Sequence, residues 1–283
     1  MCKISVITIN LNNLNGLKRT VESVVAQTCR DFEYIVIDGA STDGSKEYIE
    51  TVDRIDYWVS EPDKGIYNAM NKAIAKAKGE YCIFMNSGDC FYNEKVLEKM
   101  TLVLKGKDFY TGHPVLVYED REEVVKLPKR ISLGFMLFGS IYHQCTFTRT
   151  AILKERPYNE QHRLVSDWEY FFKEWLLFNR SYEILDSLIA YFYMDGLSNT
   201  NKELDTRERA EVVRELFFEL YKRGELEEQI PTRFNQDGDK NLLTFKQKMT
   251  KAEMLSPVKR DLKILRNAFK LLWKDIINSI NKK

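Results

Sequence analysis

Short apolar runs alternate with helix-like segments over the first ninety residues of the chain. Four runs of five or six residues, rich in β-branched and aromatic side chains, are typical of buried strands and cover residues 4–9, 32–37, 55–59 and 81–85. Between them, apolar residues recur at spacings of three and four, which predicts three intervening helices. Strands and helices that alternate with short connections favour parallel pairing. The pattern therefore predicts an α/β fold with a mostly parallel, doubly wound sheet.

The second half of the chain is predicted to add further strands and helices. Residues 108–125 alternate in the manner of strands, and residues 140–147 are predicted to form another strand. An aromatic helix begins with Ser166 or Asp167 near its N-cap. A charged helix is predicted over residues 206–224, followed by an irregular connector.

The last part of the chain differs from the rest in charge. Residues 246–283 carry eleven Lys and Arg against three Asp and Glu, so the net charge of +1 leaves an acidic balance of −7 for the preceding residues. Apolar residues of this tail recur at spacings of three and four on one helix face: Val258, Leu262, Leu265, Phe269, Leu272, Ile276 and Ile280. We expect three parts: a main domain of residues 1–200, a helical extension and connector of residues 201–245, and a basic amphipathic helix of residues 246–283.

Composition argues against several classes of protein. No run of about eighteen apolar residues exists, and the N-terminus lacks the pattern of a secretory signal. The five cysteines are odd in number and form no C-x-x-C pair, which argues against a disulfide framework or a zinc site. These features predict a protein of the reducing cytoplasm.

Polar clusters follow the predicted strands at the ends where an α/β sheet places its ligands. Thr8 and Asn10 close the first strand, Asp38 closes the second, and the sequence N-S-G-D at residues 86–89 follows the fourth. Because the carboxyl ends of parallel strands meet at one edge, we expect these clusters to lie together. Asp38 is suited either to accepting an N–H of a nucleobase or to capping a turn.

A further polar pair precedes the third predicted helix. Asp63 and Lys64 lie just before the helix start, where backbone N–H groups and a lysine can hold a phosphate. Taken alone, Lys64 could equally be an ordinary surface residue. The turn after the first strand reads Asn-Leu-Asn-Asn, so glycine-rich loops of the P-loop or dinucleotide-binding type are excluded there.

Two carboxylates and one histidine have the chemistry of a catalytic site. Asp89 offers the oxygen ligand that Mn²⁺ or Mg²⁺ prefers, although a single carboxylate needs substrate phosphates to complete the site. Asp167 is either a helix cap or a general base near an acceptor. His143 either lines the pocket or belongs to the core or rim.

Five segments together resemble the family 2 inverting glycosyltransferases of the GT-A fold, a Rossmann-like α/β fold. In order, they read VITINLNN, YIVIDGASTDGS, VSEPDKGIYNAMNKAIAKAKGEYCIFMNSGD, HQCTF and VSDWEYFF. The likeness covers residues 3–200 and is strongest to the bacterial branch that builds capsule, O-antigen and exopolysaccharide repeat units. It implies a GT-A sheet with a C-terminal helical extension.

The resemblance also implies roles for single residues. Asp167 matches the catalytic base, and Asp89 keeps a carboxylate of the family's D-x-D region, from which Asn86 and Gly88 depart. Residues 194–198 resemble a loop that closes near the donor. The residues assigned to the nucleotide-sugar site are Thr8, Asn10, Asp38, Asp63, Lys64, Asn86, Ser87 and, as a pocket residue, His143.

The expected activity is transfer of a sugar from a nucleotide-sugar, with UDP favoured as the carrier, to a hydroxyl of a lipid-linked or oligosaccharide acceptor in bacterial surface polysaccharide synthesis. The expected metal is Mn²⁺ or Mg²⁺, held chiefly by Asp89 and the donor diphosphate. Two alternatives stay open: a catalytically weak scaffold of a polysaccharide assembly complex, and a sugar-1-phosphate nucleotidyltransferase. No nucleic-acid partner is expected.

The basic tail has two interpretations. A basic amphipathic helix with Trp273 beside its apolar face suits an anionic membrane surface, and the lipid-linked acceptors of this branch favour docking there. Alternatively, the apolar face packs on the transferase body or pairs with a second copy in a homodimer. We expect a cytoplasmic protein, peripheral on the inner face of the cell membrane.

Overall fold

The computed structural model describes residues 3–194 and 201–225. The described residues divide into two compact units, one of residues 3–129, 141–194 and 201–208 and the other of residues 130–140 and 209–225. The predicted basic helix, nearly all of the predicted connector, and the donor-loop segment after Met194 lie outside the described residues.

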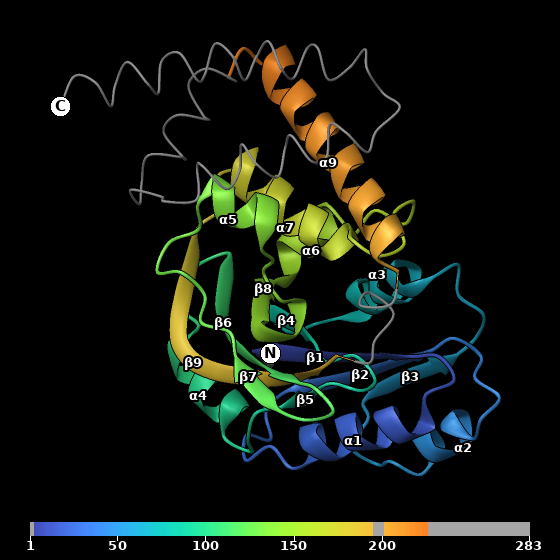
Figure 1. Cartoon of the computed structure of the whole chain (residues 1–283). Coiled ribbons are helices and arrows are strands. Elements are labelled where there is room, and N and C mark those ends of the chain that lie inside the picture. Colours follow the sequence, from blue (N-terminus) through green and yellow to red (C-terminus); the bar gives the residue numbers. More distant parts are fainter. Residues whose placement is uncertain (1–2, 195–200, 226–283) are drawn as a thin grey trace. The chain divides into compact units, whose positions relative to one another are not determined.

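The described residues of the first unit form a nine-stranded mixed sheet in the order β3-β2-β1-β4-β8-β6-β9-β5, with β7 paired to β6 (Figure 1). Four neighbouring strands are parallel, as the alternating pattern predicts: β3 (Tyr57–Ser60), β2 (Glu33–Asp38), β1 (Ile4–Asn10) and β4 (Tyr81–Phe84). In their register Asn10 lies beside Asp38, and Asp38 lies beside Ser60. The carboxyl ends of these strands therefore meet at one edge.

The other strands make the sheet mixed. β8 (Thr146–Arg149) pairs antiparallel with both β4 and β6 (Phe109–Val117), whereas β9 (Tyr182–Tyr193) is parallel to β6. β5 (Cys90–Phe91) pairs antiparallel with β9, and β7 (Glu122–Val124) pairs antiparallel with β6. The predicted parallel half is thus extended by strands whose partners are distant in sequence.

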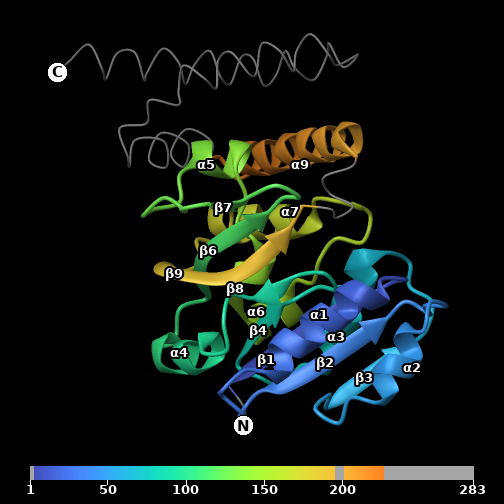
Figure 2. The ribbon, with the colours of Figure 1, turned by 60° about the horizontal axis from the view of Figure 1, so that its bottom comes forward.

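Helices cover both faces of the sheet (Figures 1 and 2). One face carries α1 (Leu14–Val25), α2 (Ser45–Glu50) and α4 (Val96–Val103), and the other carries α3 (Ile66–Lys76), α6 (Thr150–Glu155) and α7 (Ser166–Leu176). This is the predicted doubly wound arrangement, which leaves the strand ends accessible to a ligand.

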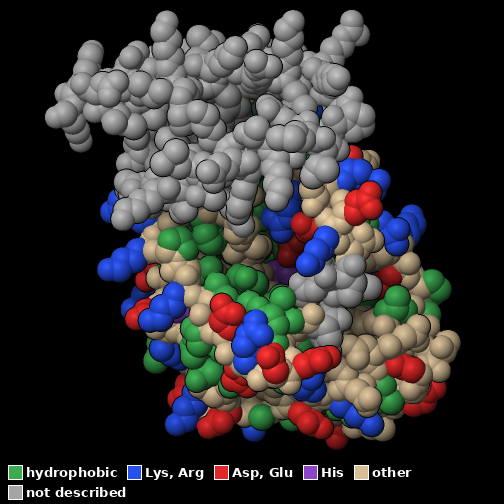
Figure 3. Space-filling model, in the orientation of Figure 1, with side chains coloured by type: hydrophobic (Ala, Val, Ile, Leu, Met, Phe, Trp, Pro, Cys, Tyr) green, Lys and Arg blue, Asp and Glu red, His purple; other side chains and the backbone are tan. Residues whose placement is uncertain are grey.

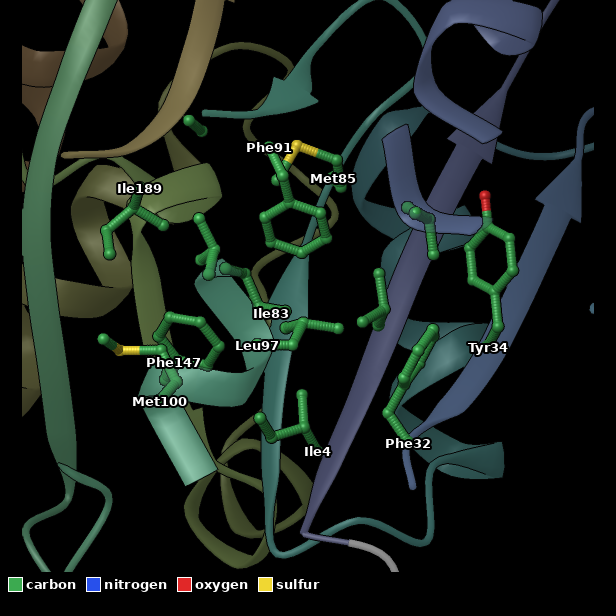
Figure 4. Close-up of a cluster of buried hydrophobic side chains, with 14 of the residues drawn as sticks. Ile4, Phe32, Tyr34, Ile83, Met85, Phe91, Leu97, Met100, Phe147 and Ile189 are labelled. Atoms are coloured by element: carbon green, nitrogen blue, oxygen red, sulfur yellow. The ribbon is translucent and has the colours of Figure 1, made fainter. Parts of the chain in front are cut away.

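A buried apolar cluster joins the sheet to α1, α2 and α4. Ile83 of β4, Leu97 and Met100 of α4 and Phe147 of β8 lie together in it (Figure 4). Burying a side chain of this size contributes roughly 1.5–3 kcal/mol. The cluster holds β1, β2 and β4 side by side and so positions the polar residues at their ends.

The predicted strand at residues 140–147 is wrong over its first part. Residues 143–145 form a short 3-10 helix, η1 (His143–Cys145), and the strand begins only at Thr146. The carbonyl of Tyr142 accepts the N–H of Cys145 at 3.0 Å and the hydroxyl of Thr146 at 2.7 Å, which folds the chain into a turn. This turn takes His143 out of the strand ladder.

Two helix starts differ in how they are capped. α2 begins after Gly44 and has no side-chain cap, although Asp43 accepts the N–H of Ser45 at 3.1 Å. α7 begins at Ser166, close to the predicted start. The N-cap of α7 is Val165, so Asp167 does not cap this helix. The interpretation of Asp167 as a helix cap is therefore wrong, but as an acidic residue of the first turn Asp167 does lie where the helix dipole favours a negative charge.

The described part of the second unit consists of α5 (Leu133–Phe138) and most of α9 (Lys202–Lys222). α9 begins four residues before the predicted helix at 206–224. Ser132 caps α5 by accepting the N–H of Phe135 at 3.1 Å. Among the described helices, none is both long and apolar enough to cross a membrane.

Candidate active site

Polar side chains at the carboxyl ends of β1, β2 and β4 are joined by hydrogen bonds. Nδ2 of Asn10 donates to Oδ1 of Asp38 at 2.8 Å, and the hydroxyl of Ser87 donates to Oδ1 of Asn10 at 2.7 Å. The predicted convergence of the three strand-end clusters is therefore confirmed, with Asn10 at its centre.

The carboxylate of Asp38 is buried and organises the loop after β2. Besides Asn10, it accepts the N–H and the hydroxyl of Ser41, at 2.9 and 2.6 Å, and the hydroxyl of Ser60 at 2.6 Å. Burial opposes ionisation, but these hydrogen bonds prevail and lower the pKa of Asp38 below its usual value. A carboxylate offers about four lone-pair sites, and these donors use them all. A nucleobase N–H could bind Asp38 only in place of one of them.

Thr8 faces the interior of the sheet. Its hydroxyl donates to the carbonyl of Met85 at 2.8 Å and lies 3.1 Å from the hydroxyl of Tyr34, and the residue is fully buried. The contact with Met85 holds the end of β4 beside β1. Thr8 therefore supports the segment that follows β4 from within the fold.

Asp63 and Lys64 lie near the end of β2. A Cβ atom built on Gly39 would come within 3.2 Å of Oδ2 of Asp63, so this carboxylate approaches the end of β2 closely because Gly39 has no side chain. The other oxygen of Asp63 lies 2.6 Å from the ammonium group of Lys72. Lys64 is exposed, and its backbone N–H donates to Oδ1 of Asn68 at 3.2 Å.

The N-S-G-D segment forms a tight turn that α1 supports. Gly88 has a φ of 115°, which side chains rarely adopt, and this explains a glycine in the segment. The hydroxyl of Thr20 donates to the carbonyl of Asp89 at 2.6 Å and accepts the N–H of Gly88 at 3.0 Å. The turn carries one carboxylate, Asp89, which is largely buried.

A divalent cation fits the N-S-G-D turn only together with a bound nucleotide. Within residues 3–194 and 201–225, no group of three or more His, Cys, Asp or Glu side chains could hold a metal ion. Asp89 supplies a hard oxygen ligand of the kind that Mn²⁺ and Mg²⁺ prefer, and the oxygens of a bound diphosphate would supply others. The residues present therefore fit an ion that binds with a nucleotide.

Asp167 lies in the first turn of α7 and accepts hydrogen bonds from two side chains. The hydroxyl of Tyr67 donates to Oδ1 at 2.8 Å, and Nδ1 of His143 lies 2.7 Å from Oδ2. The side chains of Asp167 and His143 are each 17% exposed. Burial would raise the pKa of Asp167, but the hydrogen bond and charge of His143 and the hydrogen bond from Tyr67 hold it below its usual value. Asp167 is thus an ionised carboxylate between two donors.

His143 lies between Asp167 and the N-S-G-D turn. Its Nε2 is 3.1 Å from Nδ2 of Asn86, so it contacts both groups. Burial would lower the pKa of His143, but the hydrogen bond to Asp167 and the negative charges of Asp167 and Asp89 raise it above its usual value. The structure thus brings together Asn86, His143 and Asp167, which the sequence predicts separately as site residues.

Tyr67 belongs to the candidate site but was not predicted from the sequence. It lies on the buried face of α3 with Met70 and Ile74 and is 5% exposed. Its position on the apolar face of a predicted helix could have indicated a buried hydrogen-bond partner, because a buried tyrosine hydroxyl usually has one. That partner is Asp167.

Charged side chains of both signs are interspersed over the lower part of the face shown in Figure 3. Nucleic-acid-binding domains instead concentrate Lys and Arg in a basic patch or stripe. On the lower part of this face, the described Lys and Arg residues form no continuous basic patch.

These features define an α/β protein with a cluster of hydrogen-bonded polar residues at the carboxyl edge of its sheet and a partly buried carboxylate, Asp167, linked to that cluster through His143. Residues 5–166, more than half of the chain, match the family model described as Glycosyl transferase family 2. The chain belongs to glycosyl transferase family 2.

Two similar curated proteins are named as glycosyltransferases. An uncharacterized glycosyltransferase of Mycobacterium tuberculosis is 38% identical over 177 residues, which cover 59% of this chain and 66% of the relative. A PGL/p-HBAD biosynthesis glycosyltransferase of Mycobacterium bovis is 27% identical over 214 residues, which cover 69% of this chain and 79% of the relative. The chain thus spans just under two thirds of the first relative.

Solved structures share the fold at low identity. S. aureus TarS in complex with UDP-GlcNAc matches with a TM-score of 0.63 and 20% identity, over 77% of this chain and 66% of that chain. A mannosyltransferase from Pyrobaculum calidifontis in complex with GDP-Man and Mn²⁺ matches with a TM-score of 0.55 and 15% identity, over 78% and 64%. The predicted GT-A type of fold is therefore confirmed.

Proposed function

We propose that this protein is an inverting glycosyltransferase in which Asp167 is the general base. The observation that carries the proposal is the setting of Asp167, an ionised carboxylate that accepts hydrogen bonds from Tyr67 and His143. Through His143 it is linked to Asn86 in the turn that also carries Asp89. A base beside the acceptor and a metal-binding carboxylate beside the donor are the two groups that this reaction needs.

In the proposed reaction, an acceptor hydroxyl gives its proton to Asp167 while its oxygen bonds to the anomeric carbon of the donor sugar. The bond from that carbon to the diphosphate oxygen breaks on the opposite face, so the configuration inverts. Tyr67, His143 and the backbone N–H of Trp168 each use one lone pair of the carboxylate, which leaves about one to accept the acceptor O–H. The lowered pKa of Asp167 keeps this base ionised.

The donor would bind at the strand ends. Asn10, Asp38 and Ser87 form a hydrogen-bonded polar rim, and Asp63 and Lys64 lie nearby. A bound Mn²⁺ or Mg²⁺, held by Asp89 and the diphosphate, would neutralise charge that develops on the leaving group. UDP is the favoured carrier, and the similar fold of TarS with its bound UDP-GlcNAc supports this choice.

The proposed acceptor is a lipid-linked or oligosaccharide hydroxyl in bacterial surface polysaccharide synthesis. Support comes from the family resemblance and from the relative named for PGL/p-HBAD biosynthesis. We also propose that the basic tail, residues 246–283, docks the enzyme on the anionic inner face of the cell membrane.

The test is release of nucleoside diphosphate from a panel of nucleotide-sugars by the full chain, with and without Mn²⁺ and oligosaccharide acceptors. Asp167→Asn should nearly abolish turnover and largely spare donor binding. The matched control is Asp120→Asn, which changes an exposed carboxylate between β6 and β7 and should alter neither. Near-normal turnover by Asp167→Asn would show that Asp167 is not the general base.

The same panel tests the alternatives. Consumption of a nucleoside triphosphate with a sugar 1-phosphate would support a nucleotidyltransferase. Donor binding without turnover under all conditions would support a scaffold.

A further inference from the structure

Four side chains from separate segments form one hydrogen-bonded chain beside the proposed reaction centre. The hydroxyl of Tyr67 in α3 is 2.8 Å from Asp167 in α7, and Asp167 is 2.7 Å from His143 in η1. His143 is in turn 3.1 Å from Asn86 in the N-S-G-D turn. The chain therefore joins the segment proposed to bind the donor to the carboxylate proposed to activate the acceptor, and His143 is the link.

The contacts assign a direction to both nitrogens of His143. Nδ2 of Asn86 can only donate, so Nε2 accepts, and the ring proton of a neutral imidazole lies on Nδ1, where it is donated to Asp167. The ring of Phe84 meets the imidazole edge-on, with centroids 6.5 Å apart and an interplanar angle of 86°. This packing restricts the ring, so its Nδ1–H can orient the carboxylate.

Asn86 can serve either charge state of His143. Its Oδ1 is buried and has no hydrogen-bond partner among the residues that the structure describes. A half-turn of the amide would bring Oδ1 to Nε2, where it could accept the second proton of an imidazolium. A carboxylate at this position could not donate to a neutral Nε2. An asparagine therefore suits the link better than the aspartate that the family pattern favours.

We propose that His143 is a positioning residue that couples the donor-binding turn to the general base. Its Nδ1–H orients the carboxylate of Asp167, and the hydrogen bond of its Nε2 to Asn86 fixes the position of the ring. This inference rests on the proposed function. A donor that settles on the N-S-G-D turn holds Asn86 in place. Through His143 it then holds Asp167 in the orientation that accepts the proton of the acceptor.

The two contacts of His143 can be removed one at a time. In His143→Asn, the side-chain amide lies near the position of Nδ1 and can still donate to Asp167. In His143→Gln, the longer amide reaches the position of Nε2 and can still meet Asn86. We expect His143→Gln to lower kcat about 100-fold with little change in donor KM, because a reacting group displaced by about 1 Å costs that much. His143→Asn should keep most of kcat and raise donor KM.

The pH dependence of kcat separates positioning from a general loss of structure. The charged groups that face His143 are Asp167 from α7 and Asp89 from the N-S-G-D turn, and Tyr67 reaches Asp167 from α3. Because His143 lowers the pKa of Asp167, His143→Gln should move the acid limb of kcat to higher pH, and His143→Asn should move it less. If His143 had a purely structural role, its substitution would reduce the fraction of active enzyme and leave the acid limb of kcat at the same pH.

Turnover by the wild type is measured first, because it separates the two proposals. Failure to release nucleoside diphosphate from any nucleotide-sugar would refute both of them. With an active wild type, equal losses of kcat in the two variants, or unmoved acid limbs in both, would overturn the role of His143 alone.

A measurement on the wild type covers the case in which neither variant folds. Nitrogen-15 NMR of histidine-labelled protein should show the proton of His143 on Nδ1. Its resonances should change when Mg²⁺ and the nucleoside diphosphate of the active donor are added. A neutral ring with its proton on Nε2 instead of Nδ1, or resonances that do not change, would overturn the coupling.

Discussion

Replacing Tyr67 by Phe removes one hydroxyl from the proposed active site and leaves the ring in place. This hydroxyl donates to Oδ1 of Asp167 at 2.8 Å, and Tyr67 is 5% exposed, so water has little room to replace it. The ring packs against Tyr158 with centroids 5.6 Å apart, a contact that phenylalanine would keep. The substitution therefore isolates one hydrogen bond to a charged group.

The expected loss of stability follows from that hydrogen bond. A hydrogen bond to a charged group contributes about 1.5–3 kcal/mol to stability. In a protein of this size, 1 kcal/mol shifts Tm by about 2–4 °C, so Tyr67→Phe should lower Tm by roughly 3–12 °C. Loss of the donor also raises the pKa of Asp167, because its hydrogen bond helps to hold that pKa down. The acid limb of turnover should therefore move to higher pH.

Tyr170 provides a matched control in the same aromatic cluster. Its hydroxyl is buried and has no hydrogen-bond partner in the described part of the chain, and its ring centroid lies 5.2 Å from that of Tyr158. Tyr170→Phe should leave Tm unchanged or raise it, since it removes an unpaired polar group. Calorimetry and initial rates across the acid limb measure both effects. Equal Tm values for the two variants, with the same acid limb, would refute the role given to Tyr67.

Three further predictions concern the donor turn and the tail. Calorimetry should find weak Mn²⁺ binding to the protein alone and much tighter binding in the presence of nucleoside diphosphate. Tight binding to the protein alone would contradict a metal site with one carboxylate. Because Asp89 supplies that carboxylate, Asp89→Ala should reduce donor turnover more than Asn86→Ala does. Gly88→Ala should destabilise the protein by about 1–3 kcal/mol in urea unfolding, because φ is 115° there, and an unchanged unfolding free energy would count against this strain. Removing residues 246–283 should abolish flotation with anionic vesicles and preserve donor turnover, and equal flotation of both proteins would rule out membrane docking by the tail.

The strand-end site could be predicted because its information is local. Asn10, Asp38 and the N-S-G-D segment each follow a short apolar run directly. Parallel strands joined by helices bring such positions to one edge of a sheet, whatever the details of packing. The order of the sheet beyond β4 could not be found in this way. β8 pairs antiparallel with β4 across more than sixty residues, and it follows directly on the 3-10 turn at His143.

Which of the strand-end side chains remains open to a ligand was decided by tertiary structure. The sequence places Thr8 and Asp38 at strand ends, but both are fully buried. The Thr8 hydroxyl donates to the carbonyl of Met85, and Asp38 accepts hydrogen bonds from the loop after β2 and from the ends of β1 and β3. A residue's place at the end of a strand does not reveal whether neighbouring strands and loops supply its hydrogen-bond partners.

By itself, the sequence determined the mostly parallel sheet, the edge where its polar residues gather and the presence of a carboxylate at residue 167. Only the tertiary structure placed that carboxylate between Tyr67, which is 100 residues away, and His143, which also meets Asn86 across 57 residues. The periodicity of a segment reports the face on which a side chain lies, but not the group that it meets on another element. Hydrogen bonds at about 3 Å form only where the packing of two elements against the sheet brings their atoms together.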